Sequence, residues 1–276
     1  FIALKTKDAI VDRFRDNGGV RPNVDLRFPD LKINVHIDRS VCTISLDTSG
    51  ESLHRRGYKL ATNIAPINEV LAAGLIMLSG WDGQSDFMDP MCGSGTMLAE
   101  AAMIACNIPP NLMRKEFAFE RWEDWDVDLF EKIEESLLKK TRDFHHKIMG
   151  YDKSPSAVHK AKENIKNAHL DEFITIKHED FFKTQRPGGE QKLHMVFNPP
   201  YGERLDIQME QFYKQIGDTL KQNYPNTDAW FITSNLEALK HVGLRPSRKI
   251  KLFNAKLESR LVKYQIYEGS KKAKFN

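Results

Sequence analysis

The sequence predicts an α/β protein whose larger part is a seven-stranded, doubly wound sheet ending in an antiparallel hairpin. Short apolar runs alternate with helical patterns from about residue 86 onward, which is typical of a parallel sheet. The last two apolar runs are separated only by residues 254–260, too few for a crossover helix, so they must pair as antiparallel strands. The chain before about residue 50 has a different pattern, which predicts a second, smaller α+β module.

In this first module, apolar residues at helical spacing predict a helix over residues 7–15, which ends at the glycines after Asn17. Alternating apolar and polar residues predict strands at 31–37 and 41–46, and together these form a hairpin. We assign residues 1–52 to this module. Because the sequence opens inside an apolar stretch, we expect an element to be truncated there.

Residues 53–276 form the second predicted domain, in which a helix at 68–79 precedes the alternating pattern. The predicted strands cover residues 86–88, 147–151, 174–178, 194–197, 229–233, 250–253 and 261–267. The helices predicted between them cover residues 96–106, 128–144, 156–167, 208–224 and 236–241.

Composition excludes several classes of protein. The hydrophobic content of 41% is that of a globular protein, and no apolar run approaches the roughly 18 to 20 residues of a membrane span. No signal segment is visible at the start, and three cysteines without a CxxC pair favour neither a disulfide framework nor a zinc site. We therefore expect a soluble, cytoplasmic protein without a metal. A formal net charge of +3 is too small to indicate a nucleic-acid partner by itself.

The strongest motif follows the first strand of the predicted sheet and reads Asp89-Pro90-Met91-Cys92-Gly93-Ser94-Gly95-Thr96. Glycines let a ligand approach the backbone, and the start of the next helix offers N–H groups to an anion. A dinucleotide site is disfavoured, because Leu98 stands where a third glycine is required and the next strand-ending acid is far along the chain. The alternative is a tight turn without a ligand.

Acidic residues end the next two strands. Asp152, followed by Lys153, can accept hydrogen bonds from two ribose hydroxyls, each worth roughly 1.5 to 3 kcal/mol. Asp180 precedes Phe181 and can accept a hydrogen bond from an adenine amino group beside an apolar wall. The alternatives are a solvated cap at the first position and a surface turn at the second.

The fourth strand ends in Asn198-Pro199-Pro200-Tyr201. The Asn198 side-chain oxygen and the Pro199 carbonyl can accept the two hydrogens of an exocyclic or amide nitrogen, and the prolines fix the backbone that aims them. Tyr201 can stack on an extruded base. A proline-rich turn without a ligand is the alternative. Because this loop and the glycine loop follow the first and fourth strands, we expect them to meet at the switch point of the sheet.

A third cluster, Arg55, Arg56 and Tyr58, precedes the first helix of the second predicted domain and could grip phosphate and stack on a base. Alternatively, the arginines could bridge the two domains through carboxylates. The pair His145 and His146 lacks further ligands at metal-binding spacing.

The residues now described resemble the THUMP-bearing guanine-N2 methyltransferases, including the bacterial enzymes that act on 23S ribosomal RNA. The resemblance covers nearly the whole chain and rests on five segments: residues 53–58, 89–96, the insertion with Phe119 and Trp122, 198–205 and 254–261. It departs from the family in lacking the N-terminal half of the THUMP module, and nothing here provides room for a second methyltransferase domain.

This resemblance implies a Rossmann-like class I methyltransferase that uses S-adenosylmethionine (SAM) and methylates guanosine N2 in RNA. It implies that residues 89–96 bind the methionine moiety, Asp152 the ribose, Asp180 the adenine, and residues 198–201 the target base, with Arg204 near the RNA. Transfer to adenine N6 in DNA, to a protein glutamine or to tRNA stays open, as does an RNA-binding module with a vestigial cofactor site.

Overall fold

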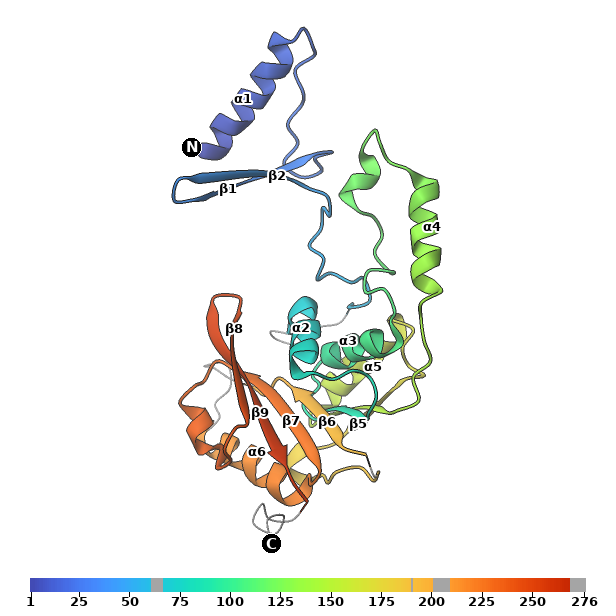
Figure 1. Cartoon of the computed structure of the whole chain (residues 1–276), viewed down its shortest axis with the longest axis vertical. Helices are drawn as coiled ribbons and strands as arrows, with labels where there is room; N and C mark the ends of the chain where they lie inside the picture. The colour runs from blue at the N-terminus through green and yellow to red at the C-terminus, as the bar shows by residue number, and fades with distance from the viewer. Residues whose placement is uncertain (61–66, 190, 201–208, 269–276) are drawn as a thin grey trace. The chain divides into compact units, whose positions relative to one another are not determined.

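The computed structural model describes residues 1–60, 67–189, 191–200 and 209–268. The chain divides into two compact units, Phe1–Leu53 with Lys115–Glu131, and His54–Arg114 with Lys132–Asn276 (Figure 1). The division after Leu53 lies one residue from the predicted domain boundary. The segment 115–131, however, groups with the first unit, whereas the sequence analysis assigned it to the second domain, residues 53–276.

The first unit contains one long helix and a two-stranded sheet. Helix α1 spans Ile2–Asp16 and begins five residues earlier than predicted. Strands β1 (Lys32–Asp38) and β2 (Val41–Asp47) pair antiparallel from Lys32↔Asp47 to Asp38↔Val41, which confirms the predicted hairpin.

The segment 115–131 is bound to the N-terminal segment by two backbone hydrogen bonds and one from a tryptophan side chain. It contains the short 3₁₀ helix η1 (Ala118–Arg121) and the start of helix α4 (Val127–Leu138). The Ala118 and Phe119 amides donate to the carbonyls of Ser49 and Thr48 at 3.3 and 3.2 Å. Trp122 Nε1 donates to the carbonyl of Asp30 at 3.3 Å. These pairings explain why two segments distant in sequence form one unit.

The second unit is built on a seven-stranded sheet with the order β5-β4-β3-β6-β7-β9-β8. The first five of these strands are parallel, and β9 is antiparallel to both β7 and β8. The strands are β3 (Phe87–Asp89), β4 (Ile148–Asp152), β5 (Ile174–His178), β6 (Leu193–Phe197), β7 (Thr227–Thr233), β8 (Arg248–Asn254) and β9 (Leu257–Ile266). The predicted doubly wound sheet with a terminal hairpin is confirmed.

Helices cover both faces of this sheet and bury its apolar residues in two clusters. One cluster contains buried residues of α2 (Glu69–Ser79), α3 (Thr96–Cys106) and α5 (Pro155–Asn167). The other contains residues of α6 (Met209–Asn223), of the 3₁₀ helices η2 (Phe181–Lys183) and η3 (Ala238–Val242), and of β6 and β7. Burial of both faces explains why the central strands read as continuous apolar runs.

Several elements of the second unit differ from the sequence prediction. Helix α4 ends at Leu138 instead of residue 144, because the backbone after it bonds elsewhere: the Arg142 amide donates to the Cys106 carbonyl at 2.9 Å. The helix predicted at 236–241 is the 3₁₀ helix η3. The terminal hairpin closes at Ala255-Lys256, with Ala255 at a φ of 53°, so its strands are longer than predicted. In the described parts of the chain, no helix has the length and apolar character needed to cross a bilayer.

Candidate active site

The two predicted loops open at the same edge of the sheet. Strand β3 pairs in parallel with β4 on one side and with β6 on the other, with Met88 opposite Met195. The glycine loop follows β3 and the Asn198-Pro199-Pro200 segment follows β6. From β3 the chain adds β4 and β5 on one side of the sheet and then β6 and β7 on the other, so the strand order reverses between β3 and β6. Open α/β sheets bind ligands at such a point. Both loops thus follow the two neighbouring strands that flank the switch point.

Hydrogen bonds between backbone groups hold the glycine loop in shape. The Cys92 amide donates to the Tyr151 carbonyl at 2.8 Å, and the Gly95 amide donates to the Cys92 carbonyl at 2.8 Å. Gly95 has a φ of 82°, and a Cβ there would lie 3.3 Å from the Ala161 Cβ on α5. This glycine therefore lets α3 and α5 pack closely. It is also the N-cap of α3 and offers no side chain to the helix's first amides, which suits an external carboxylate.

Two carboxylates flank this loop. Asp89 is 3% exposed, and its Oδ1 accepts a hydrogen bond from the Met91 amide at 3.0 Å. Burial and the neighbouring Asp152 carboxylate raise the pKa of Asp89 to about 8. Asp152 accepts from the Gly93 amide at 3.0 Å through Oδ2 and from the Ser154 amide at 2.9 Å through Oδ1. Since a carboxylate has about four acceptor sites, Asp152 orients the loop and retains capacity for ribose hydroxyls.

The two residues after β5 that were predicted to bind adenine, Asp180 and Phe181, both take part in holding the fold together. Asp180 is the N-cap of η2 and accepts a hydrogen bond from the Phe182 amide at 3.2 Å. Phe181 is 2% exposed and packs against Phe197 and Tyr224, so its ring belongs to the core and offers almost no surface to a ligand. The half-buried Phe182 is the better candidate for the apolar wall. Lys153, beside Asp152, is exposed.

Asn198 directly follows β6 and carries the most informative atom of the site. Its Oδ1 is buried and accepts no hydrogen bond from any residue that the structure describes. An acceptor buried without a donor costs about 1 to 3 kcal/mol, and among the described residues this oxygen has none. An amine donor in the site would satisfy this oxygen. Pro199 is buried and Pro200 half-buried next to it, whereas Tyr201 and Arg204 lie outside the described residues.

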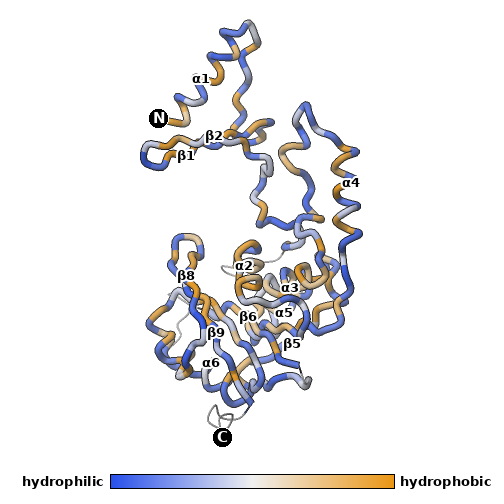
Figure 2. The backbone as a smooth tube through the Cα atoms, in the orientation of Figure 1, coloured by the Kyte–Doolittle hydropathy of each residue, from blue (hydrophilic) through white to orange (hydrophobic). Residues whose placement is uncertain are grey.

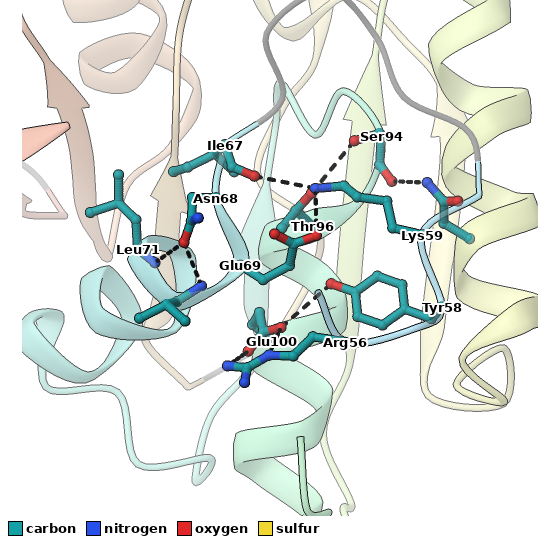
Figure 3. Close-up of polar contacts among 12 residues, drawn as sticks. Arg56, Tyr58, Lys59, Ile67, Asn68, Glu69, Leu71, Ser94, Thr96 and Glu100 are labelled. Carbon is teal, nitrogen blue, oxygen red and sulfur yellow. Dashed lines mark hydrogen bonds and ion pairs between the residues drawn. The ribbon is translucent and has the colours of Figure 1, made fainter. Parts of the chain in front are cut away.

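The fold buries two of the three residues predicted to contact RNA, Arg56 and Tyr58, beside Glu100 (Figure 3). Arg56 is 7% exposed and Tyr58 2%. Arg56 Nε lies 3.4 Å from Glu100 Oε1, and the Tyr58 hydroxyl donates to the same oxygen at 3.4 Å. Burial raises the pKa of Glu100 to about 7, against the opposing effect of Arg56. A direct RNA contact does not fit Arg56 or Tyr58; only Arg55 is exposed.

The ion pair between Arg56 and Glu100 lies within the second unit and does not bridge the two predicted domains. Further polar contacts connect residues 59 and 60 to α2 and α5, and α5 to the glycine loop. Lys59 Nζ lies 3.0 Å from Glu69 Oε1 at the start of α2 and donates to the Ile67 carbonyl at 3.2 Å. Asn164, fully buried on α5, donates to the Ser94 carbonyl at 3.0 Å and accepts from the Leu60 amide at 3.1 Å. The segment 56–60 therefore fixes three helices and the loop.

Sequence reasoning did not find Glu100 or Asn164 as members of the site's support. A signal was present at Glu100, since it is an acid inside an otherwise apolar helix, and such a residue is buried only with a partner. Among the described residues, no group of three or more histidine, cysteine, aspartate or glutamate side chains is placed to hold a metal ion.

Comparison with known proteins gives matches along most of the chain. A family model described as an RMKL-like methyltransferase domain matches residues 56–263, and a THUMP domain model matches residues 1–47. The ribosomal RNA large subunit methyltransferase K/L of Cellvibrio japonicus is 39% identical over 96% of this chain. This chain spans 37% of the length of that relative.

In two further matches, this chain covers a larger share of the other protein. The RNA methyltransferase candidate slr0064 of Synechocystis sp. is 38% identical over 97% of this chain and 70% of its own. The crystal structure of SMU.472 in complex with S-adenosylhomocysteine has a TM-score of 0.83 and 27% identity, covering 97% of this chain and 70% of that one. The matched domain contains both loops and the Glu100 network, so the chain belongs to the RMKL-like methyltransferase domain family.

Proposed function

We propose that this chain transfers a methyl group from SAM to the exocyclic N2 of a guanosine in RNA, with 23S ribosomal RNA as the substrate. The observation that carries the proposal is the buried Asn198 Oδ1, which accepts no hydrogen bond from the described residues and follows β6 beside the glycine loop after β3. The match to a THUMP domain and the names of the K/L relatives support RNA as the substrate class.

An exocyclic amine conjugated to a ring is a poor nucleophile, because its lone pair is delocalised into the ring. In the proposed reaction, Asn198 Oδ1 and the Pro199 carbonyl would accept the two amine hydrogens and so turn the lone pair away from the ring plane. The prolines at 199 and 200 restrict the backbone, so the acceptors are oriented before the base arrives. No strong general base is required, since the nitrogen loses its proton readily after transfer.

SAM, when bound, supplies a methyl group made electrophilic by a positively charged sulfur. The residues that would hold it are Asp152 for the ribose, Asp180 for the adenine and the α3 N-terminus for the methionine carboxylate. Asp152 already fixes the Gly93 amide, so ribose recognition and loop geometry depend on one carboxylate. Half-buried Phe182 would line the adenine side.

The test is methyl transfer from tritiated SAM into 23S ribosomal RNA purified from a strain that lacks the modification. We expect N2-methylguanosine in the nuclease digest, identified by mass spectrometry. An RNA digest without this nucleoside would disprove the proposed reaction. The Asn198→Ala variant, assayed in parallel, controls for contaminating activity.

Parallel reactions separate the substrate classes that share this loop chemistry. Duplex DNA tests transfer to adenine N6, a protein with accessible glutamines tests transfer to the amide, and unmodified tRNA tests the other RNA class. We expect label in ribosomal RNA alone. Methyladenine in DNA or methylglutamine in protein would replace the proposed function with the corresponding alternative.

A further inference from the structure

The hairpin formed by β8 and β9 extends beyond the rest of the sheet (Figure 1). The pairing of β7 with β9 ends at Thr233↔Arg260, whereas the pairing of β8 with β9 continues to Asn254↔Leu257. Residues 257–259 therefore have no partner on β7 in this pairing. At about 3.3 Å per residue, the hairpin overhangs the last β7 pair by roughly 10 Å.

The overhang lies on the same edge of the sheet as the candidate active site. Strand β7 runs parallel to β6, with Phe197 opposite Phe231, so the carboxyl end of β7 is level with Asn198. Strand β9 is two positions from β6 in the sheet, which corresponds to about 10 Å at the usual strand spacing. The hairpin tip thus rises beside the loop proposed to hold the target base, within reach of neighbouring nucleotides.

This hairpin concentrates positive charge. Residues 245–260 contain six basic residues and one acidic residue, whereas the whole chain has a formal net charge of only +3. The basic residues are Arg245, Arg248, Lys249, Lys251, Lys256 and Arg260. Lys249, Lys251 and Lys256 are exposed. A local basic surface of this kind, more than total charge, is what attracts a phosphate backbone.

The two faces of β8 differ in what they contact. Ile250 and Leu252 pack against the apolar core, whereas Lys249, Lys251 and Phe253 alternate with them and are exposed. Figure 2 shows that hydrophobic and hydrophilic residues are mixed along the hairpin. Because successive side chains of a strand point to opposite faces, the two lysines and the phenylalanine share one face.

Phe253 stands at the end of that row and is 59% exposed. Lys251 Nζ lies 5.6 Å from the centre of the Phe253 ring, and it also pairs with Glu258 at 2.7 Å. An exposed aromatic ring with a lysine beside it, on a strand face that also carries Lys249, suits a single-stranded nucleic acid, whose bases stack on the ring and whose phosphates meet the cations. A purely apolar protein partner would not require the surrounding charges.

We propose that the tip of the β8–β9 hairpin, residues 248–260, is an RNA-binding element that holds the single-stranded segment next to the target nucleotide. Phe253 stacks on a base, and Lys249 and Lys251 contact phosphates. This inference rests on the proposed function above. It assigns RNA contact to a surface separate from Arg56 and Tyr58, which the fold buries.

The test compares RNA affinity, its salt dependence and SAM affinity in variants of the full chain. The probe is a short fluorescein-labelled single-stranded RNA, measured by fluorescence anisotropy, and SAM binding is measured by calorimetry. Phe253→Ala should weaken RNA binding about five- to a hundredfold, and Phe253→Tyr should restore most of it. The double variant Lys249→Gln/Lys251→Gln should reduce the slope of log K against log salt by about 1.4 in magnitude. SAM affinity should not change.

The matched control is Lys166→Gln/Lys221→Gln, which removes two exposed lysines from the last turns of α5 and α6. These helices end at the opposite edge of the sheet, so the salt slope should stay that of the unaltered chain. Hairpin variants with the same RNA affinity and salt slope as this control would overturn the proposal, while methylation of RNA by the unaltered chain would still support the function. An unaltered chain that neither binds nor methylates RNA would overturn both.

Discussion

The Oδ2 atom of Asp152 accepts a hydrogen bond of 3.0 Å from the backbone amide of Gly93. Asp152 ends β4 and Gly93 lies in the loop after β3, the neighbouring strand. One carboxylate thus shapes the loop proposed to hold the methionine moiety and stands where the ribose would bind. Its second oxygen is used by the Ser154 amide, which fixes the carboxylate plane.

Replacement of Asp152 should affect SAM affinity before it affects chemistry. Removal of a charged acceptor costs about 1.5 to 3 kcal/mol, so Asp152→Ala should raise the SAM dissociation constant roughly 10- to 150-fold. The value of kcat at saturating SAM should change only severalfold. Calorimetry and steady-state kinetics measure the two effects. Asp152→Asn keeps an acceptor oxygen and should lose less; a large fall in kcat with unchanged SAM affinity would contradict this role.

Replacement of Asn198 should lower kcat and leave SAM affinity unchanged, the reverse of the effect expected for Asp152. If its Oδ1 aligns the amine only during transfer, Asn198→Ala should lower kcat about a hundred- to a thousandfold, as loss of one oriented transition-state contact does elsewhere. SAM affinity should be unchanged. Because Oδ1 accepts no hydrogen bond from the described residues, the melting temperature should not fall. Transfer by this variant at the rate of the unaltered chain would rule out the alignment role.

The buried carboxyl of Asp89 should make stability depend on pH. Its pKa is raised from 3.8 to about 8, so between these values the folded chain binds a proton that the unfolded chain releases. Stability is therefore highest at the acidic end of this window and falls as pH rises. The Asp89→Asn variant keeps an acceptor for the Met91 amide and should show a shallower decline. Urea unfolding at several pH values measures the free energy of unfolding of both proteins. If this free energy falls equally steeply with pH in both, Asp89 is not the cause of the decline.

Adjacent arginines should respond differently to truncation. Arg56→Ala leaves the buried Glu100 without its cation, which typically costs about 3 to 5 kcal/mol and should lower Tm by roughly 6 to 20 °C. Arg55→Ala, at an exposed position, is the control and should lower Tm much less, because interactions of exposed charges contribute little to stability. Thermal unfolding followed by circular dichroism measures both. Similar small shifts in the two variants would show that the Arg56 pair contributes little to the fold.

The sequence determined the elements whose signals are local. Helix α3 begins and ends where predicted, because a glycine turn precedes it and Asn107 closes it in the left-handed conformation. Strand β5 also matches its predicted bounds. The antiparallel pairing of the last two strands followed from the shortness of their connection, although the location of the turn did not. The glycine loop and the Asn198 loop were found from residue order, since parallel strands place such loops on one edge.

Tertiary structure alone decided which candidate residues are accessible and which are supports. Arg56 is separated from Glu100 by 44 positions, and Asn164 from Ser94 by 70, so no local pattern reveals either pair. Phe181 is buried against Phe197 and Tyr224, which belong to other elements. Helix α4 ends early because its following backbone bonds to the end of α3. Propensity and periodicity act over a few residues, whereas burial and charge pairing depend on segments that only the folded chain brings together.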